Sequence, residues 1–308
     1  MKKLLTLILT LALLLGLGAA GAETTEAAAL TLTAPGGAPA LAVAALAAKN
    51  PENFTFVAAD TIAAAFAKAE ADFIIAPVNA GAKLYRAGKS AYRLAAVVTW
   101  GNLYIASQKE GLSEADLKGA EITLFGENTI NASVVLYALK ENGIEPSKVN
   151  YLAGAAETQA LLLSNPEAIV VTAEPALTAA RIKNDKISAI AVNALYQKAT
   201  ENDGYAQAGL FVNPATLEGR KEAADAYLEQ VREAAGLCAA DVEAVAAAAV
   251  KLEILPNAKV AQAAIPNCAI RYLSAAEAKA QVETTAAVDL SQFGGEVPAD
   301  DFYYGLEK

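Results

Sequence analysis

One long extended stretch near residue 100 limits what this chain can fold into. Residues 93–99 and 103–107 are two apolar runs, and Trp100-Gly101-Asn102 lies between them. Together they are much longer than a typical strand, which has about five or six residues. We therefore expect the chain to leave one sheet here and to enter another, with Trp100 near the boundary.

Short apolar segments alternate with alanine-rich segments on both sides of this crossing. Before it, strands are expected at 30–34, 54–58, 73–77 and 93–99, with helices between them. After it, the pattern restarts with strands at 121–125, 149–152, 168–172 and 187–192. Such alternation is typical of parallel sheets that are covered by helices.

Residues 205–212 form a last extended run, which we interpret as a second crossing between the sheets. Beyond it the expected structure is mainly helical, with helices at 217–237, 239–251 and 275–282. The fold class that follows is α/β, with two lobes that each contain a mostly parallel sheet flanked by helices. A chain of 308 residues is long enough for two such domains. We expect lobe I to contain residues 23–101 and 206–308, and lobe II to contain residues 102–205.

The N-terminus has the pattern of a secretory signal peptide. Met1-Lys2-Lys3 is positive, residues 4–17 are apolar, and Ala20-Gly21-Ala22 offers a small-x-small cleavage site. The apolar run is short for a membrane span, although a retained anchor is the alternative. Cleavage after Ala22 would leave an exported, soluble protein in the periplasm or outside the cell.

Composition excludes several classes of function. The chain has no histidine, which excludes Ser-His-Asp and Cys-His catalysis and His-ligated zinc. Its two cysteines, Cys238 and Cys268, are too few for a four-cysteine metal site. In an exported protein they could pair as a disulfide or remain buried free thiols. The formal net charge of −10 disfavours nucleic acid and anionic membranes as partners. We expect no metal and no cofactor.

Glycine and polar residues follow the expected strands of the first half. Gly36 and Gly37 come after the first strand, and Asn79 follows the strand that begins at Phe73. Because open α/β sheets bind ligands at the carboxyl ends of their strands, these three residues are candidates for ligand binding. For the glycines, a plain tight turn is the alternative interpretation. Trp100 and Asn102 extend the candidate site at the crossing.

Similar positions recur in the second half. Asn128 and Thr129 follow the strand at 121–125, and Glu174 follows the strand at 168–172. N-capping alone is the alternative for Asn128 and Thr129, and a helix start is the alternative for Glu174. The helix starts at Pro39, Thr129 and Pro175 favour an anionic ligand group, whereas the Glu174 carboxylate favours a cationic one. The ligand charge therefore stays open.

In their order along the chain, these features resemble the substrate-binding proteins of ABC importers, in particular the group that includes sulfonate-, nitrate- and thiamine-precursor-binding proteins. The motifs that carry the resemblance are Ala34-Pro35-Gly36-Gly37, residues 73–79, residues 98–102, residues 125–129, residues 172–175 and the ending 294–304. The resemblance covers nearly all of the chain beyond the expected signal peptide. It implies the type II periplasmic-binding-protein fold, with two α/β lobes that close on a ligand.

The function implied by the resemblance is capture of a small solute and its delivery to the permease subunits of an ABC importer. Such a protein is expected to be monomeric and not to be an enzyme. Two alternatives stay open: a periplasmic enzyme on the same fold, dehydratase-like, with Glu174 or Glu127 as proton donor, and a ligand sensor that docks on a receptor. Many such binding proteins have a lipid-bearing cysteine at the cleavage site, which this chain lacks.

Overall fold

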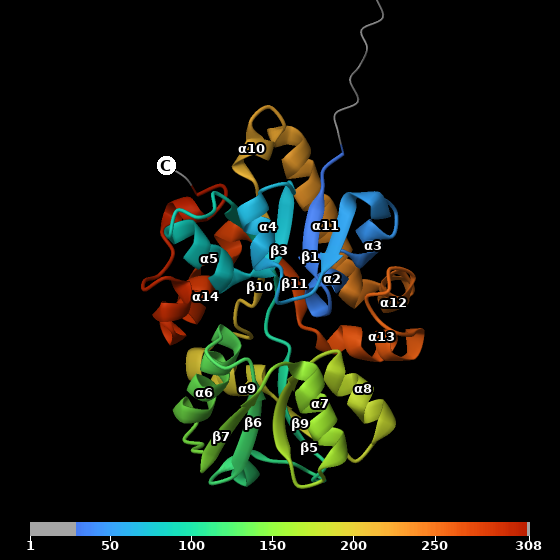
Figure 1. Ribbon diagram of the computed structural model, residues 1–308, viewed down its shortest axis with the longest axis vertical. Coiled ribbons are helices and arrows are strands. Elements are labelled where there is room, and N and C mark those ends of the chain that lie inside the picture. Colours follow the sequence, from blue (N-terminus) through green and yellow to red (C-terminus); the bar gives the residue numbers. More distant parts are fainter. Residues whose placement is uncertain (1–28, 307–308) are drawn as a thin grey trace, which may run out of the picture.

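The computed structural model describes residues 29–306. The expected signal peptide, residues 1–22, lies outside the described residues. Two separate sheets form the framework, and Figure 1 shows them one above the other with helices around each. None of the helices within residues 29–306 combines the length and the apolar character that a membrane crossing requires.

Sheet A, the upper sheet in Figure 1, has six strands in the order β11-β4-β10-β3-β1-β2. They are β1 (Leu32–Pro35), β2 (Phe54–Val57), β3 (Phe73–Pro77), β4 (Arg93–Thr99), β10 (Ala208–Val212) and β11 (Ile270–Ser274). β1 is parallel to β2 and β3, whereas β10 is antiparallel to β3 and β4, and β11 is antiparallel to β4. β1 to β4 therefore run in one direction, and the two strands from the C-terminal part of the chain run in the other.

Sheet B has five strands in the order β7-β6-β8-β5-β9. They are β5 (Leu103–Ser107), β6 (Glu121–Phe125), β7 (Lys148–Leu152), β8 (Ile169–Ala173) and β9 (Ser188–Ala191). β6 is parallel to β7 and β8, and β5 is antiparallel to its neighbours β8 and β9. Both sheets are thus mixed: most strands of each sheet run in one direction, but three of the five neighbouring pairs in sheet A and two of the four in sheet B are antiparallel. Sheet A holds chain segments from both sides of sheet B in the sequence.

Burial on both faces explains why the central strands appear in the sequence as apolar runs. All five residues of β10 are buried, as are four of the five residues of β3. A strand covered by helices on both faces has no solvent side, so its sequence does not alternate. β2, at the edge of sheet A, is only partly buried.

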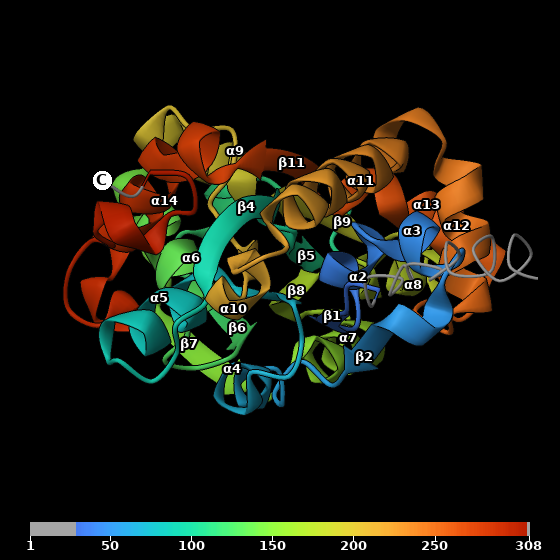
Figure 2. The same cartoon turned by 90° about the horizontal axis from the view of Figure 1, so that it is seen from above.

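Helices cover both faces of sheet A. On one face lie α2 (Ala38–Leu41), α3 (Ala44–Ala47) and α11 (Lys221–Ala240), and on the other lie α4 (Ala63–Lys68), α5 (Val78–Arg86) and α14 (Ala275–Val288). Viewed from above in Figure 2, α5 and α14 lie on one side of the sheet and α3 and α11 on the other. α10 (Pro214–Leu217) precedes α11, and α12 (Val242–Lys251) and α13 (Ala258–Ala264) follow it, with α12 packed against α3.

Sheet B is also covered on both faces. α7 (Ala155–Ser164) and α8 (Ala176–Lys183) pack on one face, and α6 (Ile130–Glu141) and α9 (Val192–Thr200) on the other. Short 3₁₀ helices complete the fold: η1 (Pro51–Asn53), η2 (Glu114–Leu117), η3 (Ile265–Asn267), η4 (Leu290–Phe293) and η5 (Asp300–Phe302). One apolar cluster is continuous from Ile74 of sheet A through Trp100 to Ile122 of sheet B.

The structure corrects several expected boundaries. The single helix expected at 40–49 is two short helices, α2 and α3. α4 ends at Lys68 because Ala69 adopts a left-handed φ of 51°. α11 begins at Lys221, since Gly219 interrupts the expected helix with a φ of 82°. The sequence interpretation missed α9, α13 and β11.

Cys238 and Cys268 are both buried free thiols, so the disulfide considered from the sequence is not formed. Each thiol instead donates to a nearby carbonyl oxygen: Cys238 Sγ to Leu41 at 3.5 Å and Cys268 Sγ to Ala264 at 3.3 Å. Burial raises the pKa of Cys238 to about 12. A thiol with such a pKa stays protonated near neutral pH and behaves as a small apolar core residue.

The aromatic C-terminal segment docks on sheet A. Tyr303 forms a parallel bridge with Leu94 of β4. The Phe302 side chain is 1% exposed, and its ring centroid lies 5.6 Å from that of Tyr85 and 6.1 Å from that of Phe211. The segment therefore fills part of the core rather than lying on the surface.

Replacement of Phe302 with alanine should lower the free energy of unfolding by about 3–5 kcal/mol, because it leaves a cavity among the rings of the core. Leu290, which is 39% exposed, is a control in the same part of the chain, and its replacement with alanine should change stability by less than about 0.5 kcal/mol. Urea unfolding followed by circular dichroism measures both. Equal effects of the two variants would contradict the packing described for the tail.

Candidate functional site

The two segments that connect the sheets lie against each other. The first is Trp100-Gly101-Asn102, between β4 and β5, and the second is residues 201–207, between α9 and β10. A Cβ atom on Gly204 would overlap the carbonyl oxygen of Trp100, and a Cβ atom on Gly101 would overlap the ring of Tyr205. Gly101 also has a φ of 81°, which residues with a side chain rarely adopt. Only glycine at both positions allows so close a contact.

Side chains from lobe II hold these two segments in place. Asn193, in the first turn of α9, donates from Nδ2 to the carbonyl oxygens of Trp100 at 2.8 Å and Gly101 at 2.7 Å. The Tyr205 hydroxyl donates to Asn131 Oδ1, in the first turn of α6, at 3.0 Å. We use the term double crossing for residues 100–102 together with residues 201–207.

Trp100 is part of the double crossing and is 2% exposed. Its indole N–H donates to the carbonyl oxygen of Arg271 at 2.8 Å, and the Arg271 guanidinium lies 4.8 Å from the ring centroid. Arg271 also forms an ion pair with Asp203, with an Nη2–Oδ1 distance of 3.0 Å, and this hydrogen bonding lowers the pKa of Asp203. The ring of Trp100 thus packs within the protein, and its only polar atom is already bonded.

Neutral amides, two of them within the double crossing, connect the two lobes. Gln207 Nε2 donates to Asn102 Oδ1 at 3.0 Å and to Asn131 Oδ1 at 3.4 Å. Asn102 Nδ2 donates in turn to the carbonyl oxygen of Glu174 at 2.9 Å. We call Asn102, Asn131 and Gln207 the amide group. Sequence reasoning identified Asn102 but missed the other two, although the place of Gln207 in the second crossing was a usable signal.

Glu174 is only 3% exposed and serves the start of α8. Its Oε2 accepts from the Thr178 backbone N–H at 3.1 Å, and its Oε1 accepts from the Thr178 hydroxyl at 2.9 Å. Burial raises the pKa of Glu174, and the two Thr178 hydrogen bonds and Arg181 act in the opposite direction. Because both carboxylate oxygens are engaged, the structure gives this residue a role at the helix start.

Three further candidates follow strand ends. Gly36 is exposed and donates its N–H to the Val57 carbonyl oxygen at 3.0 Å, while Gly37 precedes α2 with a φ of 85°. Asn79 lies in the first turn of α5 and is partly buried, and its side-chain oxygen has no hydrogen-bond partner among the described residues.

The last two candidates precede α6. Asn128 is exposed and has a φ of 58°, a value that asparagine tolerates better than most residues. Thr129 caps the helix, since its Oγ1 accepts from the Ala132 N–H at 3.4 Å and donates to the Gly126 carbonyl oxygen at 2.6 Å. The structure therefore shows the capping role for Thr129.

The lobes also touch on either side of the amide group. The Tyr104 hydroxyl of β5 donates to the carbonyl oxygen of Asn267, in η3, at 2.9 Å. Ser133 of α6 donates to Asp289 Oδ2, which follows α14, at 2.7 Å. Contacts through single hydrogen bonds of this kind can break and re-form when two lobes move relative to each other.

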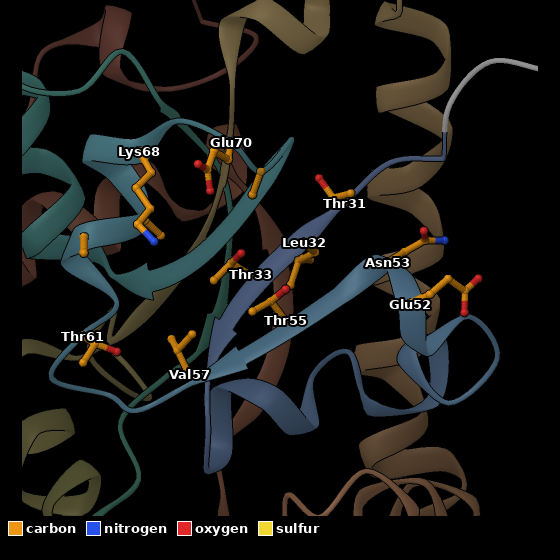
Figure 3. Close-up of a pocket in the computed structure, with 13 residues that line it drawn as sticks. Thr31, Leu32, Thr33, Glu52, Asn53, Thr55, Val57, Thr61, Lys68 and Glu70 are labelled. Atoms are coloured by element: carbon orange, nitrogen blue, oxygen red, sulfur yellow. The ribbon is translucent and has the colours of Figure 1, made fainter.

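A cavity of about 380 Å³ lies away from this boundary, and none of the predicted site residues lines it. Figure 3 shows its lining residues along β1 and β2, with Lys68 of α4 and Glu70 to one side. Its lining includes Thr31, Thr33, Thr55, Thr61, Lys68 and Glu70. In the part of the chain that the structure describes, no group of cysteine, aspartate and glutamate side chains is placed to hold a metal ion.

Replacement of Gly204 with alanine should lower the free energy of unfolding by about 1–3 kcal/mol, because the added methyl group forces the crossing segments apart. Gly236, inside α11, is a matched control, since a Cβ atom there meets no atom within 4 Å. Its replacement with alanine should stabilise the protein by up to about 1 kcal/mol through helix propensity. Thermal unfolding compares the two variants, and a neutral Gly204→Ala would contradict the close contact at the double crossing.

The raised pKa of Glu174 predicts a pH-dependent effect of Glu174→Gln. Protonated Glu174 favours the folded state, so its contribution is present below the ordinary value of 4.5 and is lost as pH rises through the folded pKa. The glutamine variant has no such loss. Its stability relative to the wild type should therefore be greater at about pH 7 than at about pH 4, as measured by urea unfolding. A difference that is the same at both pH values would show that the pKa is not raised.

Comparison with known proteins identifies solved structures that share this architecture. No family model and no curated protein matches the chain. An ABC transporter structure from Parabacteroides distasonis has a TM-score of 0.75 at 24% identity, covering 89% of this chain and 98% of that chain. The periplasmic aliphatic sulphonate binding protein SsuA from Escherichia coli has a TM-score of 0.68 at 16% identity, covering 89% and 91%.

Two further structures extend the comparison. The ligand-binding component of an ABC-type import system from Staphylococcus aureus, solved with zinc bound, has a TM-score of 0.64 at 12% identity over 89% of this chain and 95% of that chain. The desulfurization enzyme DSZB has a TM-score of 0.58 at 12% identity over 90% and 96%. The resemblance read from the sequence is thus confirmed in the fold: this chain has the two-lobed α/β fold found in binding components of ABC importers.

Proposed function

We propose that this protein is an extracytoplasmic solute-binding protein that captures a small molecule between its lobes and delivers it to the permease subunits of an ABC importer. The observation that supports it most is the meeting of the two lobes at strand ends, where Gln207 of the second crossing bonds to Asn102 and Asn131. The fold shared with import components over 89% of the chain is consistent with this function.

In this proposal, the boundaries of lobe II lie between residues 101 and 102 and between residues 205 and 206. A solute that contacts residues of both lobes binds the closed arrangement more tightly than an open one, so it shifts the equilibrium toward closure. Gly36, Gly37 and Asn79 contribute from lobe I, and Asn128 and Thr129 contribute from lobe II. The double crossing is the hinge, and Trp100, Asn102 and Glu174 support it.

Export and a monomeric state belong to the same proposal. The signal-peptide pattern of residues 1–22 directs the chain across the membrane, and the mature protein works outside the cytoplasm as a single copy. A role other than catalysis is supported by the side chains at the boundary. The Glu174 carboxylate, the strongest candidate acid, is buried and bonded twice to Thr178, so it is poorly placed to transfer a proton to a substrate.

A solute bound between the lobes should stabilise and compact the protein. A ligand present at about 100 times its Kd should raise the free energy of unfolding by about 2.7 kcal/mol, and small-angle X-ray scattering should show a smaller radius of gyration. A thermal-shift screen against sulfonates, nitrate, pyrimidines, amino acids and carboxamides tests this, with each hit measured by calorimetry. A hit that stabilises the protein without compaction would contradict closure, and a silent screen would contradict solute capture.

A further inference from the structure

We infer that the inter-lobe site takes a neutral or cationic solute that donates hydrogen bonds, rather than a free anion such as a sulfonate or nitrate. This inference rests on the solute-binding function proposed above and deepens it by naming the ligand class. Three independent observations lead to it: the charges at the strand ends, the state of the helix starts and the unpaired amide oxygen of Asn79.

The strand ends that face the boundary between the lobes carry acids and no bases. In sheet A they are residues 36–39, 58–61, 78–81 and 100–102, and in sheet B residues 126–129, 153–157, 174–175 and 192–193. These segments contain Asp60, Glu127, Glu157 and Glu174, but neither lysine nor arginine. An anion bound among them would lose its hydration without gaining a positive partner, which is strongly unfavourable.

Two arginines lie near these segments, and both are engaged elsewhere. Arg271, at the start of β11, is paired with Asp203 and stacked on Trp100. Arg181 donates from Nε to the carbonyl oxygen of Ile187 at 3.3 Å. Because Arg271 already has a carboxylate partner, it offers an incoming anion little net attraction. The partner of Arg181, Ile187, precedes β9 and so lies at the end of that strand away from residues 192–193.

The three helix starts that favoured an anion in the sequence analysis, those of α2, α6 and α8, offer an anion little in the structure. The Glu174 carboxylate accepts the Thr178 N–H in the first turns of α8, so that helix has its own anion. Thr129 caps α6 with its hydroxyl oxygen. α2, which follows Gly37, is only four residues long, and so short a helix has a weak dipole. The sequence argument for an anionic ligand therefore loses its support in the structure.

Asn79 provides the positive indication. Its Oδ1 is buried and has no hydrogen-bond partner among the described residues. The residue before it, Val78, donates its N–H to the Gln207 carbonyl oxygen at 3.0 Å, so Asn79 lies next to the amide group. A buried carbonyl oxygen without a donor is costly, and an N–H or O–H group of a solute would satisfy it.

The amide group fits the same ligand class. Asn102, Asn131 and Gln207 carry no charge, and each presents both donors and acceptors. The oxygens of Asn102 and Asn131 accept hydrogen bonds within the protein. Solutes that match such groups are carboxamides, pyrimidines and similar neutral compounds with N–H donors. The sulfonate-binding structures share only 16% identity with this chain, so their ligand class does not transfer with the fold.

Pairs of probes that share a skeleton and differ in charge test the inference. Nicotinamide with nicotinate, benzenesulfonamide with benzenesulfonate, and uracil with orotate are measured by calorimetry on protein purified without unfolding. For any skeleton that binds, the neutral member should bind at least about tenfold more tightly than the anion. Tighter binding of an anion would overturn the inference and leave solute capture intact. No binding by any probe, together with no co-purified solute in mass spectrometry, would overturn both.

Variants of Asn79 test its role. Asn79→Leu should weaken binding of the best neutral probe at least about tenfold, whereas Asn79→Asp, which keeps an oxygen acceptor, should stay within about threefold of the wild type. Asn53→Asp is the control, because Asn53 lies before β2 at the opposite end of sheet A, and it should leave affinity unchanged. If Asn79→Leu binds normally, or Asn79→Asp weakens binding as much as Asn79→Leu, Asn79 does not accept a hydrogen bond from the solute. Unfolding midpoints confirm that each variant is folded.

Discussion

The close contact between the two segments of the double crossing, which Gly101 and Gly204 permit, is the constraint on which the rest of this structure depends. Gly101 and Gly204 allow two chain segments about a hundred residues apart to touch backbone to backbone. This contact brings Asn131 and Asn193, from two helices of lobe II, within hydrogen-bond distance of the crossing. The strand ends of two separately formed sheets are thereby turned toward a single boundary.

Much of the framework could be predicted from the sequence, because strands buried on both faces keep a simple pattern. β3, β8 and β10 stand out as apolar runs for this reason. β6, in which buried residues alternate with more exposed ones, was predicted with its observed bounds. β11 was missed because its Ile-Arg-Tyr-Leu-Ser sequence places a charged residue inside a short strand. The role of this arginine is visible only in the folded structure, where Arg271 stacks on Trp100 and forms an ion pair with Asp203.

The candidate site was harder to predict, for a physical reason. Asn102 was found because it follows a recognisable crossing, but Asn131 lies inside a helix and Gln207 just before a strand. The second crossing marks the neighbourhood of Gln207, but nothing in the neighbouring sequence marks Asn131 or shows that the two residues meet. Their significance arises from a hydrogen bond between positions that are 76 residues apart, and local patterns contain no information on such pairs. By contrast, the hydrogen bond from the Thr178 hydroxyl to the Glu174 carboxylate joins residues that are close in the sequence. The interpretation of Glu174 as part of a helix start predicted an interaction of this kind.

The neutrality of the amide group has a consequence for how the lobes move. Gln207 bonds to Asn102 and Asn131, so this contact between the lobes involves no charged group. Had lysine or arginine lined the strand ends, closure without an anion would force those charges together in a region of low dielectric constant. Amides can exchange one partner for another at a small net cost, because each broken hydrogen bond is replaced by a similar one. A solute then needs only a modest advantage over the internal contacts to favour the closed arrangement, and its own donors, directed at an acceptor such as Asn79 Oδ1, can supply it.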